Sequence, residues 1–465
     1  MKKPLLLFLI IIFQKHFAQA DCFTVVAGRD VSVTGHVMAA HNEDDYGDLI
    51  VNLYRVPENF FKETDSSWIK NDPWFDKASL SMLWFQTTRQ NFGDVYVNEY
   101  GVAIFSNACA SREDTATGKL THQLRRLVIQ YAESARNGVK ILGHLVEKFG
   151  YASSGRTYTI VDNNEAFLVS VVQGRRWIAQ RVPDDHVAVI PNYYTIGKVN
   201  LKDTVNFLYS PDIVNYAIKR GWYDPVMDGE FSFREVYAKP SVLRAAWNLP
   251  RHWAALRFLA PEQFYPDDIE FPFSFAPNSL VTRQQLERIL SDHYEDSELS
   301  YPSYAPTPHG KQPLSICNAG TKFSVITSFV TKFPNHKDNI VWFSPMKSCI
   351  YPMIPISLSV MKIPHAYQAY PLRKALKLQR QDSINTFERN KHHAFAVFNR
   401  YRQYVDTNYP AHIEHSRQLK KKFEGIIQKT RKHQCARKGS FLLLKKLRRF
   451  YKKAMREIRW ENKSS

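Results

Sequence analysis

The order of the predicted elements places this chain in the α+β class, with antiparallel sheets stacked in layers. Strand-like segments lie within residues 23–60 and 93–107, two helix-like segments lie within 121–149, and strand-like segments return within 157–196. A run of strands, then helices, then strands favours stacked antiparallel layers over the regular strand–helix alternation of a parallel sheet. The length of 465 residues allows one large mixed domain with a helical extension, or two or three domains.

The first 20 residues have the pattern of a secretory signal. Lys2 and Lys3 give a basic start, residues 5–13 are apolar throughout, and residues 18–20 (Ala-Gln-Ala) form a small-x-small cleavage site. The apolar run is far shorter than the roughly 20 residues that a membrane-spanning helix needs. We therefore expect a signal peptide over residues 1–20 and a soluble, exported mature chain (periplasmic, secreted or lumenal); an uncleaved anchor is the alternative.

Cleavage after Ala20 leaves Asp21 in front of Cys22, so one further residue has to be removed to bring Cys22 to the N-terminus. A cysteine in that position carries a nucleophilic thiol and, in its own α-amino group, a base of pKa about 7.7–8.0 that can take the thiol proton near neutral pH. An ordinary near-terminal cysteine, free or in a disulfide, is the alternative that position alone allows.

The five cysteines are few for an exported protein and do not indicate a disulfide-built scaffold. With Cys22 as a free thiol, the remaining four could pair in a pattern that the sequence leaves open: Cys109, Cys317, Cys349 and Cys435.

Two strand-like runs open the mature chain, at residues 23–26 and 31–40, with a glycine-containing turn between them. A dense polar cluster, residues 41–45 (His-Asn-Glu-Asp-Asp), follows the second run. If the two runs pair as a hairpin, this cluster returns close to Cys22. A carboxylate there could orient the α-ammonium group and an amide could bind substrate, while a solvated acidic turn is the alternative.

A second hairpin pattern covers residues 94–105, with the turn at residues 98–101 (Asn-Glu-Tyr-Gly). Asn98 and Gly101 are accounted for by the turn itself. Asn107 lies past the second apolar run, where turn chemistry explains it less well. An amide at a strand end can donate a hydrogen bond to the oxyanion that develops when a carbonyl is attacked.

Helices are predicted over residues 121–135 and 138–149, because apolar residues recur there at three- and four-residue spacing. The strands that follow are expected at residues 158–161, 166–172, 177–181 and 187–190. The last of them leads into residues 191–194 (Pro-Asn-Tyr-Tyr), which places the amide of Asn192 at a strand end beside aromatic surface.

An arginine and tryptophan group follows, comprising Arg244, Trp247, Arg251 and Trp253. Arginine suits bidentate contact with a carboxylate, such as that of a peptide. A helix with inward-facing aromatic rings and solvated arginines is the alternative. Beyond this group we expect long surface connections over 260–312 with one helix at 283–293, strands at 322–330 and 339–344, and helices from residue 371 onward.

The order and spacing of these motifs resemble those of the cysteine dipeptidases of the N-terminal-nucleophile hydrolase superfamily, the dipeptidase A and secernin group. Relatives of that group include bile salt hydrolase and penicillin V acylase. The family motifs are Cys-Thr-Thr with a Val-Gly-Lys-x-Ala-Ser turn, Arg/His-Asn-x-Asp, Asn-Glu-x-Gly-Val and Pro-Asn-x-Tyr/Phe-x-Ile-Gly. The matching segments are Cys22–Ser32, His41–Asp44, Asn98–Val102 and Pro191–Gly197, and the resemblance covers roughly residues 22–410.

The resemblance implies a four-layer αββα sandwich of two antiparallel sheets between helical layers. It implies that Cys22 is the nucleophile, that Asp44 holds its amine, and that Asn107 and Asn192 contact the oxyanion or the substrate. His41 stands where the family has an arginine, and with Asn42 it is expected to contact substrate. The second family arginine corresponds to Arg244 or Arg251, between which the sequence does not choose. Phe23 also departs from the family's usual threonine.

Residues 416–465 hold 18 Lys and Arg against three Glu, which is a net charge of +15 out of +19 for the whole chain. We therefore expect a signal peptide at 1–20, a catalytic domain at 21–375 and a helical C-terminal extension at 376–465, with a basic tail from residue 416. Binding to a polyanion belongs to this tail and not to the nearly neutral body. A basic amphipathic helix over 439–460 could lie on an anionic membrane surface or dock its apolar side on the rest of the chain.

Together these features predict hydrolysis of the amide bond of dipeptides with a free N-terminus. No metal and no cofactor are expected, because the sequence shows no His-Glu-x-x-His motif and no clustered Cys/His ligand set. A nucleic-acid partner is not expected, since the tail shows no base-reading motif; a homo-oligomer is left open. The alternatives are an acylase acting on non-peptide amides, an exported binding protein with an inactive cysteine, and a chain whose purpose lies in the tail.

Overall fold

The computed structural model describes residues 22–45, 47, 49–60, 69, 72–87, 94–121, 123–302, 305–329, 339–378, 390–433 and 436–464. The predicted signal peptide, Asp21 and Cys435 lie outside the described residues. The division of the mature chain at residue 375 stays a prediction.

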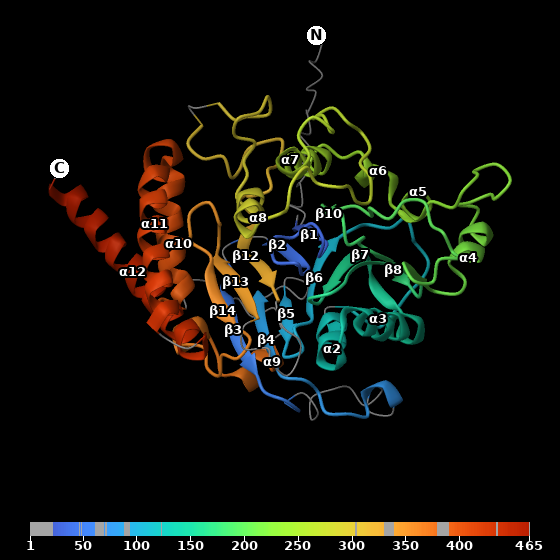
Figure 1. Ribbon diagram of the computed structural model, residues 1–465, viewed down its shortest axis with the longest axis horizontal. Helices are drawn as coiled ribbons and strands as arrows, with labels where there is room; N and C mark the ends of the chain where they lie inside the picture. Colours follow the sequence, from blue (N-terminus) through green and yellow to red (C-terminus); the bar gives the residue numbers. More distant parts are fainter. Residues whose placement is uncertain are drawn as a thin grey trace, which may run out of the picture.

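Two antiparallel sheets occupy the centre of the molecule (Figure 1). The six-stranded sheet has the order β10-β1-β2-β12-β13-β14, with β1 at Phe23–Ala27, β2 at Met38–Asp44, β10 at Val187–Ile190, β12 at Thr321–Ser328, β13 at Ile340–Pro345 and β14 at Ile354–Ser357. The eight-stranded sheet has the order β11-β9-β8-β7-β6-β5-β4-β3, with β3 at Val51–Val56, β4 at Met82–Thr87, β5 at Val95–Asn98, β6 at Ala103–Ala108, β7 at Tyr151–Val161, β8 at Ala166–Gly174, β9 at Trp177–Arg181 and β11 at Phe207–Tyr209.

Helices cover the sheets and form the C-terminal part of the chain (Figure 1). Their bounds are Gln123–Tyr131 (α2), Ala135–Phe149 (α3), Ile213–Lys219 (α4), Phe233–Tyr237 (α5), Pro240–Leu243 (α6), Leu249–Leu259 (α7), Arg283–Leu290 (α8), Leu372–Leu378 (α9), Ala394–Thr407 (α10), Tyr409–His433 (α11) and Ala436–Ser464 (α12). Two short 3-10 helices lie at Pro73–Phe75 and His365–Tyr367.

Three clusters of buried apolar side chains define the layers. The first lies between the sheets and takes Val26 and Phe343 from the smaller one and Leu53 and Phe105 from the larger one. The second lies between the larger sheet and helices α2 and α3, and the third lies between the smaller sheet and helices α7 and α8. Helix, sheet, sheet and helix layers therefore follow one another, which confirms the predicted αββα sandwich.

The helix boundaries follow from capping residues. The side chain of Ser134 accepts a hydrogen bond from the backbone N–H of Asn137, so α3 begins at Ala135 and not at the predicted residue 138. The helix ends at Gly150, whose φ of 68° suits glycine. Helix α8 begins with a capping box, in which Thr282 and Gln285 each bond to the backbone of the other.

The second strand starts later than the sequence suggests. Gly35 has a φ of 66°, and the backbone N–H groups of Thr34 and Gly35 bond to Ser32, so a turn replaces the predicted start of the strand at residue 31. Strand β2 then spans Met38–Asp44. The expectation that the polar cluster follows the strand is therefore wrong, because residues 41–44 belong to the strand. All four pair with β12, and residues 41 and 42 also pair with β1.

The hairpin predicted around residues 98–101 is confirmed as β5 and β6. The side-chain oxygen of Asn98 accepts hydrogen bonds from the N–H groups of Tyr100 and Val102, and its Nδ2 donates to the carbonyls of Ile129 and Ala132. Asn98 therefore makes the turn and holds the end of helix α2.

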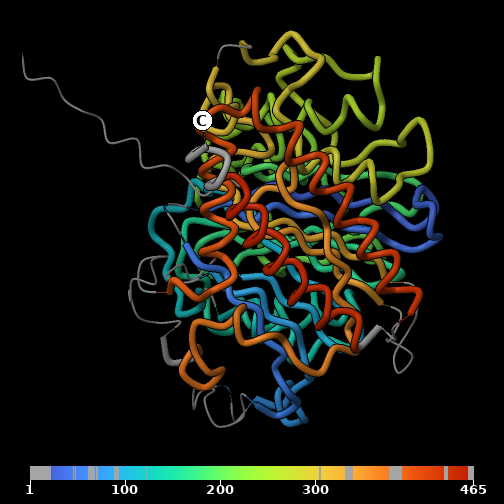
Figure 2. Tube along the Cα trace, turned by 90° about the vertical axis from the view of Figure 1, so that its left-hand side faces the viewer, coloured from blue at the N-terminus to red at the C-terminus, as the bar shows by residue number. Residues whose placement is uncertain are grey.

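The three C-terminal helices lie side by side against the six-stranded sheet (Figures 1 and 2). The apolar side of α12 packs against β14, α10 and α11. Its buried residues belong to the core cluster that continues from between the sheets to these helices: Leu443, Leu444, Leu447, Tyr451, Ala454 and Ile458. The apolar side of this helix therefore docks on the rest of the chain, which was one of the two alternatives. Contact of its basic side with a membrane stays a prediction. Within the described chain, no helix combines the length and apolar character that a membrane crossing requires.

Candidate active site

Cys22 lies at the start of β1, between β2 and β10. The antiparallel register sets Phe23 opposite Asn42 and Thr24 opposite His41, which brings Cys22 to the level of Glu43. Its side chain is 1% exposed. The predicted hairpin therefore does return the polar cluster to Cys22.

Two carboxylates surround the thiol of Cys22. Its Sγ donates to Glu43 Oε1 at 3.3 Å and to the backbone oxygen of Asp44 at 3.7 Å. Burial raises the pKa of the thiol well above its usual range, and the charges of Glu43 and Asp44 raise it further, against the opposing effect of Arg156. In the chain as described, with Cys22 inside a peptide bond, the sulfur is therefore held as a protonated thiol.

A hydrogen-bonded chain of side chains continues from Glu43. Its Oε2 lies 3.1 Å from His41 Nε2, and His41 Nδ1 lies 2.7 Å from the hydroxyl of Thr24. The imidazole is fully buried and stacks on Phe105 with ring centroids 5.2 Å apart. His41 is thus oriented from both nitrogens and from its face, which makes it a support for Glu43 beside the thiol.

Asp44 is a buried carboxylate at the end of β2. Its Oδ2 accepts a hydrogen bond from Asn318 Nδ2 at 2.6 Å, and the ammonium group of Lys347 donates to the Asn318 carbonyl. Lys322 is also buried, and burial and Lys347 lower its pKa to about 8, although Asp45 and Asp44 favour its charged form. The negative charge of Asp44 therefore lies next to the thiol, and the buried Lys322 partly balances it.

Asn107 crosses from the larger sheet to the nucleophile strand. Its Nδ2 donates to the carbonyl of Cys22 at 2.8 Å and to that of Ile190 at 2.9 Å, while its Oδ1 accepts from the hydroxyl of Thr24 at 2.7 Å. Both amide hydrogens are used by backbone carbonyls at the ends of two neighbouring strands of the six-stranded sheet, β1 and β10. In this state Asn107 fixes the position of the Cys22 backbone.

Asn192 and Arg251 form a second buried pair close to the start of β1. Arg251 Nη2 donates to Asn192 Oδ1 at 2.9 Å and to Asn248 Oδ1 at 3.1 Å, and its guanidinium lies 5.9 Å from the centre of the Phe23 ring. Asn192 Nδ2 donates to the carbonyl of Ala108 at 3.1 Å. The sequence did not choose between Arg244 and Arg251 as the second family arginine. In the structure, Arg251 is the one that lies beside Asn192.

Two predicted substrate contacts lie elsewhere. Arg244 follows the short helix α6 and is exposed. Asn42 points to the helix layer, where its Nδ2 donates to the carbonyls of Leu290 and Ile316 and its Oδ1 accepts from Ser324. Because the pairing of β2 alternates faces, His41 and Glu43 face the nucleophile while Asn42 ties α8 to the sheet.

Sequence reasoning missed Arg156 in strand β7. This buried guanidinium donates to Ser106 Oγ at 3.1 Å. Burial opposes its charge, yet the neighbouring Tyr151, Tyr158 and Cys22 raise its pKa overall. A single arginine within a strand of otherwise apolar and hydroxyl side chains is the signal that could have found it.

Cys22, His41 and Glu43 offer three ligand atoms that lie within 4.8 Å of one another, but hydrogen bonds within the group already account for their arrangement. A cavity of about 1050 Å³ is lined by none of the residues of this site. A second group of His and Cys side chains, described below, lies apart from the Cys22 site.

Comparison with known proteins follows the motifs. The model of peptidase family C69 matches residues 92–415. A probable dipeptidase of Latilactobacillus sakei is 24% identical over 384 residues, which are 77% of this chain and 78% of the relative. Dipeptidase A of Lactobacillus helveticus is 24% identical over 378 residues, which are 76% of this chain and 78% of the relative.

Among solved structures, a Caenorhabditis elegans ortholog of N-acylethanolamine-hydrolyzing acid amidase is similar over 68% of this chain and 94% of its own, with 13% identity and a TM-score of 0.30. A likeness at that TM-score carries no argument, so the fold rests on the sheets and helices of the chain itself. The family match covers well over half of the chain and includes Asn107, Asn192 and Arg251. This chain belongs to peptidase family C69, the cysteine dipeptidase family that its motifs predicted.

Proposed function

We propose that this chain is an exported dipeptidase that uses Cys22, freed at the N-terminus, as its nucleophile. The observation that carries the proposal is the setting of Cys22, whose sulfur touches Glu43 and the end of β2 beside the buried Asp44. Membership of peptidase family C69 and the dipeptidase names of its relatives support the substrate class.

The chemistry needs no group beyond the chain and water. As Cys22 Sγ attacks the scissile carbonyl carbon, the α-amine of the same residue takes the thiol proton. The resulting ammonium then gives this proton to the leaving nitrogen, the C–N bond breaks, and a thioester remains. Water attacks the thioester, its proton passes through the amine, and the acid product and the thiol are released.

The carboxylates beside Cys22 suit this cycle. A free α-ammonium group would carry a positive charge next to Glu43 and Asp44, which bear two negative charges in a buried setting. Attraction between opposite charges strengthens where water is excluded. Asp44 therefore holds the amine in place, and the ammonium offsets the carboxylate charges that otherwise keep the thiol protonated.

The two asparagines take different roles in this proposal. Asn107 spends both amide hydrogens on the carbonyls of Cys22 and Ile190, so it positions the nucleophile. Asn192, whose Nδ2 also donates to the carbonyl of Ala108, is the oxyanion donor in this proposal, with Arg251 and Asn248 fixing its orientation. A donor held by other side chains costs little reorganisation when the charge develops.

The chain as translated is inactive in this account. The nitrogen of Cys22 lies in a peptide bond, so removal of residues 1–21 has to supply the base. The basic, apolar and small-x-small order of residues 1–20 supports export as the first step of that removal.

A substrate panel tests the function. We expect the processed protein to hydrolyse dipeptides with a free N-terminus, and to act far more slowly on the same dipeptides with an acetylated N-terminus. N-acyl amino acids cleaved as fast as dipeptides would favour the acylase. No turnover of either class, with Cys22 alkylated no faster than the buried Cys109, would favour an exported binding protein.

Arg251 provides a test of the oxyanion assignment. Replacing Arg251 by leucine removes the support of Asn192, and we expect kcat to fall by about 10²-fold with little change in KM, in line with the loss of an oxyanion donor. The exposed Arg244 is the matched control, and Arg244→Leu should leave both constants nearly unchanged. A rise in KM at constant kcat for Arg251→Leu would instead assign Arg251 to the substrate carboxylate.

A further inference from the structure

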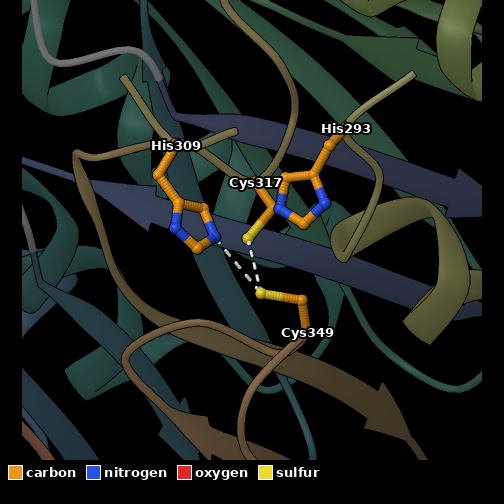
Figure 3. A group of neighbouring side chains, drawn as sticks. All are labelled: His293, His309, Cys317 and Cys349. Atoms are coloured by element: carbon orange, nitrogen blue, oxygen red, sulfur yellow. Dashed lines mark hydrogen bonds between the residues drawn. The ribbon is translucent and has the colours of Figure 1, made fainter. Parts of the chain in front are cut away.

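Four metal-ligating side chains meet in a region that the proposed reaction does not use. They are His293, His309, Cys317 and Cys349, and one ligand atom from each lies within 4.8 Å of the others. Figure 3 shows both imidazoles and both thiols pointing toward a common centre. The residues come from two loops: His293, His309 and Cys317 lie in the connection between α8 and β12, and Cys349 lies between β13 and β14.

Two distances within the cluster are close to those of a tetrahedral zinc site. Cys317 Sγ lies 3.6 Å from Cys349 Sγ, and His309 Nε2 lies 3.3 Å from Cys349 Sγ. Zinc–sulfur bonds of about 2.3 Å and zinc–nitrogen bonds of about 2.0–2.1 Å at tetrahedral angles separate two sulfurs by about 3.8 Å and a nitrogen from a sulfur by about 3.6 Å. The side chains thus stand close to the positions that an ion would require.

Each histidine is held by a carboxylate on its other nitrogen. His293 Nδ1 lies 2.8 Å from Glu295 Oε1, and His309 Nδ1 lies 2.6 Å from Asp406 Oδ1. Such pairs fix the ring so that Nε2 is presented to a metal, and they make it a stronger ligand. His293 Nε2 is buried and has no hydrogen-bond partner of good geometry among the described residues. A bound ion would satisfy this nitrogen.

The cluster is buried, and a cavity lies next to it. His293 and His309 are 2% exposed, and Tyr409 packs edge-on against both rings. The cavity of about 1050 Å³ reaches Cys349 and Glu295, so an ion can approach from that side.

We propose that His293, His309, Cys317 and Cys349 bind one zinc ion. Two thiolates and two imidazoles are a ligand set that zinc favours, and four protein ligands leave no position for substrate, which is typical of a structural site. On binding, each cysteine releases its thiol proton to solvent and both histidines bind through neutral Nε2. The ion ties the α8–β12 connection to the loop between β13 and β14.

The ion would also brace the active site. Cys317 precedes Asn318, which donates to Asp44, and Cys349 follows closely on Lys347, which donates to the Asn318 carbonyl. Asn318 and Lys347 position Asp44 from the α8–β12 connection and the β13–β14 loop, and these are the two loops that the ion would link. Sequence reasoning missed the cluster because its members are 16, 8 and 32 residues apart, which matches no compact ligand motif.

Elemental analysis of the full chain, purified under reducing conditions without a metal-binding tag, tests the site. We expect about one zinc ion per chain, lost in Cys317→Ser and Cys349→Ser and retained in Cys109→Ser and Cys22→Ala. Loss in Cys22→Ala with retention in Cys317→Ser would move the ion to Cys22, His41 and Glu43 and overturn the proposal. A metal-free native chain with a Cys317–Cys349 disulfide, found by mass spectrometry of unreduced peptides, would overturn it as well.

Cobalt decides the matter if the serine variants fail to fold. After removal of the native metal with a chelator, wild-type protein given Co²⁺ should show the strong near-ultraviolet absorption of cobalt–thiolate bonds and the visible bands of tetrahedral cobalt. A cobalt spectrum without thiolate absorption contradicts the site. Asp406→Asn should weaken zinc affinity by about 10–100-fold without removing a ligand, and an unchanged affinity would contradict the role of that carboxylate.

Discussion

Replacing Cys22 by alanine is expected to abolish dipeptide hydrolysis, with a fall in kcat of about 10³-fold or more. The variant keeps the fold but loses the atom that attacks the carbonyl, so the residual rate comes from binding alone. Steady-state kinetics on the processed protein measure the loss. Cys109→Ala is the matched control, because Cys109 is equally buried but lies outside the proposed chemistry, and its turnover should stay close to that of the wild type.

The same sulfur gives a second readout. Burial and the carboxylates of Glu43 and Asp44 hold the pKa of Cys22 high while the residue is inside the chain, so little thiolate exists at neutral pH. Alkylation by iodoacetamide, followed by mass mapping, should be slow in the unprocessed chain and fast once the α-ammonium group is present. Burial raises the pKa of Cys109 to about 11, and its labelling should be slow in both forms. Undiminished turnover by Cys22→Ala would end the proposal.

Replacing Asp44 by asparagine is expected to have the second largest effect, a fall in kcat/KM of about 10²–10⁴-fold. The variant removes the negative charge that, in our proposal, attracts and holds the α-ammonium group. It also replaces the carboxylate that accepts a hydrogen bond from Asn318 Nδ2 by an amide. Kinetics give the loss, and thermal unfolding of the same sample separates it from a loss of fold. The exposed Asp185 is the control, and Asp185→Asn should behave as the wild type.

A folded Asp44→Asn protein with full activity would exclude Asp44 as the group that holds the amine. Glu43, which contacts the sulfur directly, would then take that role. Glu43→Gln tests this second carboxylate with the same assay.

Local sequence patterns predicted the layers well, because the alternation of apolar residues and the helical spacing are short-range signals. The hairpin of β5 and β6, both helices of the outer layer and the strands between residues 158 and 190 follow from them. The start of β2 was not predicted. Residues before Gly35 have strand-forming side chains, but the positive φ of Gly35 places a turn there instead.

Site residues were predictable where a motif carried them and not where the fold alone brought them together. Cys22, Asp44 and Asn192 lie in segments that resemble family motifs, and Asn107 lies five residues beyond the end of such a segment at Val102. Arg251 was separable from Arg244 only through its contact with Asn192.

The residues that sequence reasoning missed depend on contacts between distant segments. Arg156, from the eight-stranded sheet, acts electrostatically on the thiol of Cys22. The residues of the four-ligand cluster are up to 56 residues apart in the sequence. The apolar side of α12 was likewise ambiguous until its contacts with the sheet were known, because an amphipathic helix has the same pattern on a membrane and on a protein core.

N-terminal sequencing and intact mass of the active protein, purified from a host that exports it, test the central claim most directly. We predict a chain that begins at Cys22 with an unblocked amine, and that is the species with dipeptidase activity. A fully active protein that begins at Asp21, or that still carries residues 1–20, would contradict the use of the Cys22 amine as the base.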